Sequence, residues 1–204
     1  MRWGDIPQLT SCRNYGYELS LFRYFCEYID RETAEGLVLN PDFQRGHVWT
    51  EEQQNAYIEY LLMGGTSGRT IYLNAKNIEA PSFEAQDYVC VDGLQRITAI
   101  QRFYHDEIPA FGQRYSQFEG PFNTTKFTMR VVTNDLQSRE EVLQWYLELN
   151  STGTPHSREE LERVKALLDR ERDGKQRTAL AADRGQTRPP PGSRPTTKKK
   201  SQER

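Results

Sequence analysis

YVCVDGLQRITAI, residues 88–100, begins as an apolar run, ends that run at an Asp-Gly pair, and continues with apolar residues at helical spacing. This pattern predicts a buried strand that turns sharply into a helix. The turn places Asp92, Gln95 and Arg96 beside the free N–H groups and the positive dipole end of the helix, which suits a phosphate or another anion. The alternative is that Asp92 only caps the helix and Arg96 pairs with a surface carboxylate.

The composition indicates one acidic domain with a basic extension. A chain of 204 residues holds one well-formed core. Residues 170–204 contain eleven Lys/Arg and four Asp/Glu, a net charge of +7, so the preceding residues carry −9 of the total of −2. The three cysteines follow no metal-binding spacing, and no run of about 18 apolar residues is present. We therefore expect a cytoplasmic protein without a membrane segment or a bound metal centre.

The order of elements divides the chain into four parts. Residues 1–17 form an irregular lead-in, 18–135 an α/β domain, 136–169 a helical hairpin that completes it, and 170–204 a flexible basic tail, part of which extends the last helix. Capping boxes at Thr50, Ser138 and Ser157 predict three helix starts, and strands are expected at 37–39, 70–73, 88–91 and 127–132.

A second polar turn, NPDFQRGHVW at residues 40–49, again joins a glutamine to an arginine. Arg45 supplies a second positive charge for a polyphosphate, with Gln44 beside it, and Phe43 or Trp49 stacks on a base or packs in the core. The alternative is a turn that is merely anchored to the core. Two Gln-Arg pairs at the ends of two short strands are stronger evidence for a binding site than either pair alone.

Three further segments carry polar or basic residues. Asn150 and Thr152 lie in an Asn-Ser-Thr-Gly turn, whose side chains either reach a ligand or only link two helices. Residues 64–70 are rich in glycine but lack the order of a P-loop, so we interpret them as a helix end and a loop. The tail residues Lys198, Lys199 and Lys200 either attract nucleic acid or are simply solvated.

Residues 40–49, 91–96 and 149–153 together resemble the signature blocks of the ParB-like N-terminal domain of GmrSD-type restriction endonucleases. The blocks lie in the family's order and spacing, across roughly residues 15–168. The family's second block is usually Asp-Gly-Gln-Gln-Arg. Here Leu94 replaces the first glutamine, and the other four positions match as Asp92, Gly93, Gln95 and Arg96.

The resemblance implies an α+β fold of the ParB/sulfiredoxin type: a small mixed sheet with packed helices, followed by a helical segment and a disordered basic tail. It also implies that the Asp-Gly-x-Gln-Arg corner binds or hydrolyses a nucleotide, within a restriction system that cuts modified foreign DNA. In this family a His-Asn-His domain does the cutting, either fused behind this domain or on a partner chain. The present sequence shows no such domain.

We therefore expect a nucleotide-binding domain of a DNA-directed restriction or defence system, with a nucleoside triphosphate as its ligand, with or without Mg2+. Its partners are the nucleotide, DNA contacted directly or through another protein, and a separate His-Asn-His nuclease subunit. The alternatives are a non-catalytic module that binds DNA or protein, and a weak ParB-like nickase. The expected catalytic residues are Asp92, Gln95 and Arg96; the nucleotide or phosphate ligands are Gln44, Arg45, Gly93, Arg96, Asn150 and Thr152; and the DNA contacts are Lys198, Lys199 and Lys200.

Overall fold

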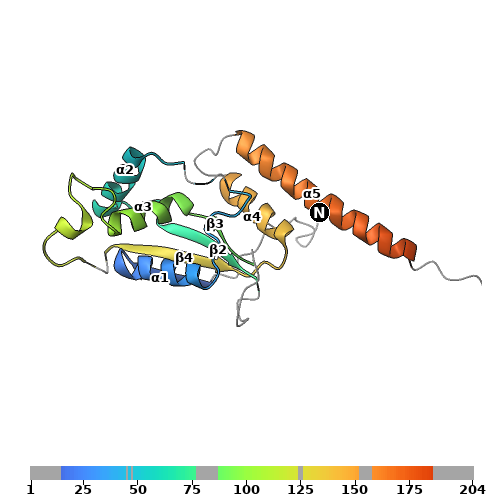
Figure 1. Cartoon of the computed structure of the whole chain (residues 1–204), viewed down its shortest axis with the longest axis horizontal. Helices are drawn as coiled ribbons and strands as arrows, with labels where there is room; N and C mark the ends of the chain where they lie inside the picture. The colour runs from blue at the N-terminus through green and yellow to red at the C-terminus, as the bar shows by residue number, and fades with distance from the viewer. Residues whose placement is uncertain are drawn as a thin grey trace, which may run out of the picture.

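The computed structural model describes residues 15–44, 46, 48–76, 87–123, 126–151 and 158–185 (Figure 1). A four-stranded sheet and five α-helices confirm the predicted α+β fold. In chain order the elements are β1 (Tyr15–Ser20), α1 (Arg23–Ala34), α2 (Glu51–Leu62), β2 (Thr70–Ala75), β3 (Tyr88–Asp92), α3 (Leu94–Tyr104), the short 3-10 helix η2 (Tyr115–Gln117), β4 (Thr128–Asn134), α4 (Arg139–Ser151) and α5 (Arg158–Gly185).

The sheet is mixed, as predicted, with the strand order β1-β4-β2-β3. β4 pairs with β1 in the antiparallel direction and with β2 in the parallel direction, and β2 and β3 are antiparallel. The strand expected at 37–39 is reduced to one parallel bridge, between Val38 and Val89. Because β3 is last in this strand order, the strand that leads into the predicted turn lies at one side of the sheet.

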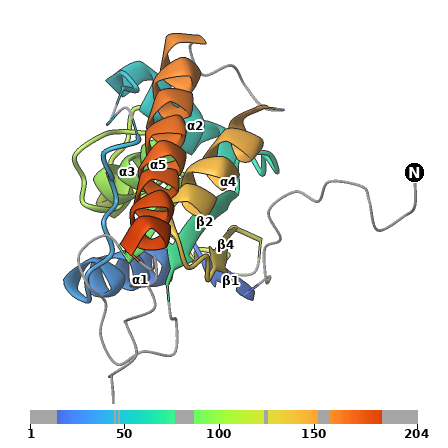
Figure 2. The same ribbon diagram turned by 90° about the vertical axis from the view of Figure 1, so that its right-hand side faces the viewer.

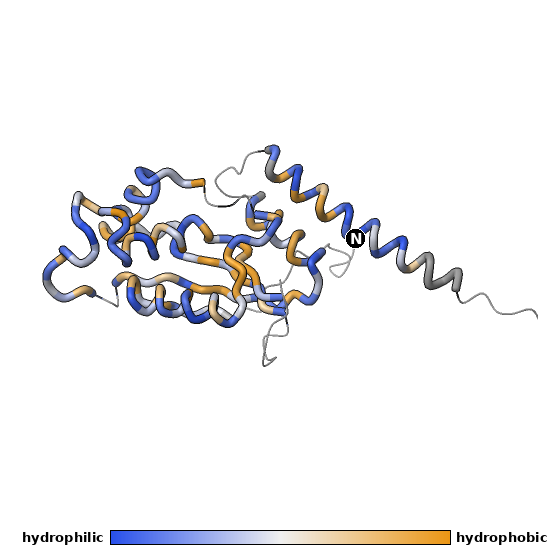
Figure 3. Tube along the Cα trace, in the orientation of Figure 1, coloured by the Kyte–Doolittle hydropathy of each residue, from blue (hydrophilic) through white to orange (hydrophobic). Residues whose placement is uncertain are grey.

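Helices cover both faces of this sheet, because alternate residues of a strand point to opposite faces. Ile71, Leu73 and Cys90 enter a core with α1, α2 and α3. Val89 and Val91 enter a second core with α4 and α5. The apolar residues accordingly concentrate along the central strands, while the helices alternate between polar and apolar faces (Figure 3).

Two of the predicted capping boxes are confirmed. Thr50 Oγ1 accepts the N–H of Gln53, whose side chain accepts the N–H of Thr50 in return. Ser138 and Glu141 make the same exchange at the start of α4. Each such cap satisfies N–H groups that a helix leaves unpaired at its start. The third predicted box, at Ser157, lies outside the described residues.

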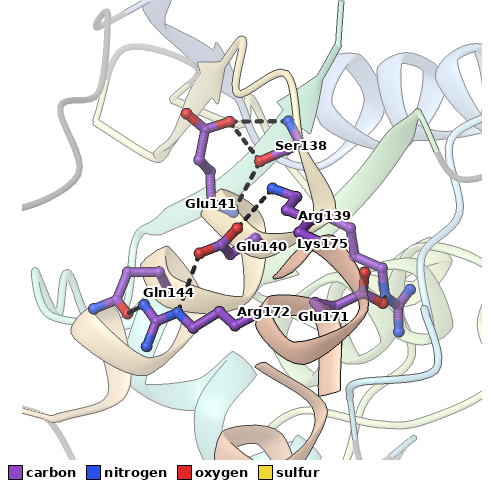
Figure 4. A network of polar contacts seen from close by, with 8 residues as sticks. All are labelled: Ser138, Arg139, Glu140, Glu141, Gln144, Glu171, Arg172 and Lys175. Carbon is purple, nitrogen blue, oxygen red and sulfur yellow. Dashed lines mark hydrogen bonds and ion pairs between the residues drawn. The ribbon is translucent and has the colours of Figure 1, made fainter. Parts of the chain in front are cut away.

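α5 is held to α4 by two different interactions. Its first half buries Val164 and Leu168 against α4, and its second half is tied by ion pairs that are seen in Figure 4. Glu140 of α4 pairs with Arg172 at 3.1 Å and with Lys175 at 2.6 Å. Exposed ion pairs are worth about 0–1 kcal/mol each, so the apolar half supplies most of the attachment.

The structure also defines the two ends of the predicted domain. α5 continues to Gly185, so the predicted extension of the last helix into the basic tail is confirmed and is longer than expected. Residues 170–185 extend beyond the body in Figure 1, and this end of α5 faces the viewer in Figure 2. At the other end, the lead-in assigned to 1–17 already contains the start of β1 at Tyr15. β1 was missed because its partner β4 lies more than a hundred residues away along the chain, and a short strand has no other signal.

Candidate functional site

The strand–turn–helix corner depends on the glycine at position 93. Gly93 has a φ of 125°, a conformation that side chains disfavour, and it directly precedes α3. A Cβ at this position would lie 2.6 Å from Cγ2 of the fully buried Ile71 on the neighbouring strand β2. The turn can therefore be this sharp, and this close to β2, only with glycine.

The first turn of α3 has no side-chain cap at its N-cap position, because that position is Gly93. The first bond within the helix runs from Ile97 N to Gly93 O, so the preceding N–H groups of this turn have no helical acceptor. Asp92 does not occupy the N-cap position; its carboxylate accepts a hydrogen bond from Arg96 Nη2 at 2.5 Å.

Arg96 is held in place but not saturated. Its side chain is 20% exposed, and Asp92 occupies one of its terminal nitrogens. Its Nε is buried and has no acceptor among the described residues. A buried donor without a partner typically costs about 1–3 kcal/mol, so the corner favours an added acceptor such as a phosphate oxygen.

Arg69 is a second cation near this corner that the sequence interpretation missed. Its Nη1 donates to Lys126 O and its Nη2 to Leu61 O, while its Nε is buried without an acceptor in the described part of the chain. Burial raises the pKa of the Tyr57 hydroxyl, and the positive charges of both Arg96 and Arg69 oppose this rise. The only signal in the sequence was the glycine-rich segment before β2, which lacks the P-loop order.

The two Gln-Arg segments are joined by their glutamines. Gln44 Nε2 donates to the carbonyl of Cys90 on β3 at 2.6 Å. In return, Gln95 Oε1 accepts the N–H groups of Val48 and Trp49, and Gln95 Nε2 donates to Gly46 O at 2.7 Å. Each glutamine thus binds the backbone of the other segment, and segment 40–49 is fixed against the corner.

The predicted segment around Asn150 is connected to segment 40–49 through α4 and α5. The ring of Tyr146 on α4 lies 5.4 Å from that of Phe43, and Asn150 Nδ2 donates to Tyr146 O one turn away. Arg163 on α5 donates to the carbonyls of Phe43 and Gln44. Phe43 is therefore a core residue, and Asn150, 9% exposed, is bonded within its own helix.

Several predicted site residues lie outside the described residues: Arg45, Thr152, Lys198, Lys199 and Lys200. The neighbours of Arg45 in the chain, Gln44 and Gly46, are both bonded to the corner. Among the described residues, no group of three or more His, Cys, Asp or Glu side chains is arranged to hold a metal ion. Cys90 is fully buried, and this burial, followed by the charge of Asp92, raises its pKa to about 12, which disfavours the thiolate that a nucleophile requires.

The family described as the GmrSD restriction endonuclease, N-terminal domain, matches residues 25–128, which is about half of the chain. The chain belongs to this family. The matched region runs from α1 to the start of β4 and contains both Gln-Arg segments of the GmrSD N-terminal domain, but not the turn after Asn150.

The other comparisons gave no match, either among curated proteins or among solved structures. The ParB-like character of this GmrSD N-terminal domain therefore stays a prediction. Within the described residues, none of its helices is both long and apolar enough to cross a membrane.

Replacing Gly93 with alanine should test the corner. Gly93→Ala adds strain of about 1–2 kcal/mol from the backbone and about 1–3 kcal/mol from the collision with Ile71. Gly36→Ala is the matched control, because Gly36 has a similar φ of 112° with no atom within 4 Å of the added Cβ. We expect urea unfolding to show about 2 kcal/mol more destabilisation for Gly93→Ala. Equal losses would mean that contact with β2 does not restrict this turn.

A second prediction concerns the glutamine that holds segment 46–49. In Gln95→Glu the carboxylate still accepts the N–H groups of Val48 and Trp49, but it repels Gly46 O. We expect roughly tenfold faster amide exchange at Val48 and Trp49, with the core unchanged. Gln101→Glu makes the same change in the last turn of α3 and should leave these amides alone. Unchanged amide exchange at Val48 and Trp49 in Gln95→Glu would show that Gln95 does not hold segment 46–49 in place.

Proposed function

We propose that this GmrSD N-terminal domain binds the phosphates of a nucleoside triphosphate at the start of α3. The observation that carries the proposal is the guanidinium of Arg96, which Asp92 holds beside the uncapped first turn while its buried Nε has no acceptor among the described residues. N–H groups without a helical acceptor, the helix dipole and a planar cation together form a typical phosphate site. Arg45, whose neighbours are bonded to this corner, supplies a second positive charge.

The geometry supports separate roles for the residues of the motif. Arg96 binds phosphate, and Gly93 allows the backbone to approach it. Gln95 Oε1 already accepts two N–H groups, so Gln95 mainly positions segment 46–49 and keeps one amide hydrogen for an oxygen of the ligand. Asp92 orients Arg96. Its second carboxylate oxygen accepts a proton from the water that attacks the terminal phosphate or, when magnesium accompanies the nucleotide, binds the ion instead.

The described residues fit a magnesium ion only as a companion of the nucleotide. Asp92 is the carboxylate at the corner, and it is shared with Arg96. Magnesium commonly binds through one or two carboxylates together with the phosphates of the substrate. An ion that arrives with the triphosphate would therefore meet Asp92 as its protein ligand.

Thermal unfolding with ATP, GTP, CTP and UTP tests the proposal, because a ligand bound only by the folded state raises the melting temperature. We expect one or more nucleotides to stabilise the protein. Arg96→Ala should weaken binding about tenfold to over a hundredfold, the loss of a charge-assisted phosphate contact of about 1.5–3 kcal/mol. Arg102→Ala, at the other end of α3, should bind normally.

Two results would contradict the proposal: no stabilisation by any of the four nucleotides, or unchanged binding by a folded Arg96→Ala protein. Phosphate release measured in the same samples tests hydrolysis. If the protein releases phosphate, Asp92→Asn should reduce the rate while nucleotide binding persists.

We further propose that DNA is contacted through the basic tail, because the preceding body carries a net charge of −9. The deletion should begin at residue 186 so that α5 stays intact, because Arg172 and Lys175 of α5 are paired with Glu140 of α4. Removing 186–204 takes away six Lys/Arg and one Glu, a net charge of +5. We expect weaker binding to duplex DNA and a smaller dependence on salt, as counterion release predicts. A Lys198→Gln, Lys199→Gln, Lys200→Gln variant should show part of this loss, and equal binding by the deletion would exclude the tail.

A further inference from the structure

The outer edge of β1 exposes backbone hydrogen-bonding groups in a regular row. β1 pairs with β4 on one side only, and no other described strand lies beside it. Leu21 N donates to Phe127 O, and this pair continues the register of the two strands. Along an antiparallel ladder, residues alternate between those whose backbone groups bond to the partner strand and those whose groups point away. Since Leu21 bonds to the partner strand, Leu19 and Tyr17 also direct their backbone groups toward β4. Gly16 and Glu18 therefore direct theirs to the open edge.

A groove lies beside this edge, between β1 and α1, and encloses about 300 Å³. Tyr17 and Leu19 form its β1 side. One stripe of α1 at helical spacing forms the other side, with aromatic residues and one charge of each sign: Tyr24, Glu27, Tyr28 and Arg31. Tyr17 and Tyr24 are 40% and 56% exposed, although aromatic side chains of this size usually bury more of their surface.

The floor of the groove is held rigid by contacts between aromatic rings and hydroxyl groups. The rings of Tyr17 and Tyr28 meet edge to face at 5.6 Å, and Arg31 lies 5.4 Å from the centre of the Tyr28 ring. Tyr28 and Tyr88 share a hydrogen bond, and the Tyr88 hydroxyl donates to Glu32 at 2.7 Å. A groove whose walls are already fixed loses little entropy when a ligand enters.

We propose that an extended peptide segment of a partner protein adds to β1 as a fifth strand. Its backbone pairs with Gly16 and Glu18, and alternate side chains enter the groove. Residues directly opposite each other in a sheet share a face, so the peptide residues opposite Tyr17 and Leu19 are apolar or aromatic. The peptide residue opposite Glu18 lies on the other face, where its best partner is a lysine or arginine.

Charge favours this occupant over a second copy of the chain. The body that presents β1 carries a net charge of −9, so two bodies repel each other while a peptide with basic residues is attracted. Glu18 also marks the edge with a negative charge, a common device against pairing between identical edges. The occupant is therefore a strand in which apolar and basic residues alternate.

Fluorescence anisotropy with the full chain and a labelled synthetic peptide of alternating phenylalanine and lysine tests this site. We expect saturable binding. It should weaken at least tenfold when the backbone nitrogens of the peptide lysines are methylated, because this removes the N–H donors of the strand and keeps the side chains. Tyr24→Ser and Glu18→Lys should each weaken binding at least tenfold. Met63→Ser, which changes a 68% exposed side chain at the end of α2, should have no effect.

Hydrogen exchange supplies an independent readout, since the amides of Gly16 and Glu18 should become protected only when the peptide is present. The proposal fails if the peptide does not bind, if the methylated peptide binds equally well, or if these amides are already protected in the free monomer. A dimer that dissociates on Glu18→Lys would identify a second copy as the occupant and would also overturn it.

Discussion

Reciprocal hydrogen bonds from two glutamines hold the candidate site in one piece. Gln44 reaches the backbone of β3, and Gln95 reaches the backbone of segment 46–49. Neither segment can move without leaving partly buried donors or acceptors unpaired, which costs free energy in addition to the lost hydrogen bonds. The position of α5 depends on the same contact, because Arg163 bonds to the carbonyls of Phe43 and Gln44. A site of three sequence segments thus rests on two carboxamides.

This arrangement separates the residues that shape the site from those available to a ligand. Both oxygen lone pairs of Gln95 are used within the protein, and Ile71 leaves no room for a side chain at position 93. Within the described part of the chain, Arg96 keeps a buried donor without an acceptor, and so does Arg69, whose charge also acts on Tyr57. Positive charge is therefore placed near an uncapped helix start in a body that is otherwise acidic. Such local contrast attracts an anion more effectively than overall charge does.

The sheet meets the rest of the molecule differently at its two sides. β3 is flanked by the bridge from Val38 and carries the corner, so the candidate site lies at this side of the sheet. β1, at the far side, pairs only with β4 among the described residues and adjoins an aromatic groove. α5 adds a third feature, since its ion-paired second half extends past the body (Figure 1). A ligand at the corner and a partner at β1 would therefore contact opposite sides of one rigid sheet.

The sequence by itself determined the features that depend on neighbouring residues. The strand, glycine turn and helix of 88–104, the capping boxes at Thr50 and Ser138, and the family blocks are local patterns, and each was predicted. Only the tertiary structure decided which backbone groups Gln44 and Gln95 bind, where Arg69 lies, and that 15–20 forms a strand with β4. Apart from the bond between Arg69 and Leu61, these contacts join residues 46 to more than a hundred positions apart. Their partners are mostly backbone groups, which every residue carries, so no residue type in the sequence marks them.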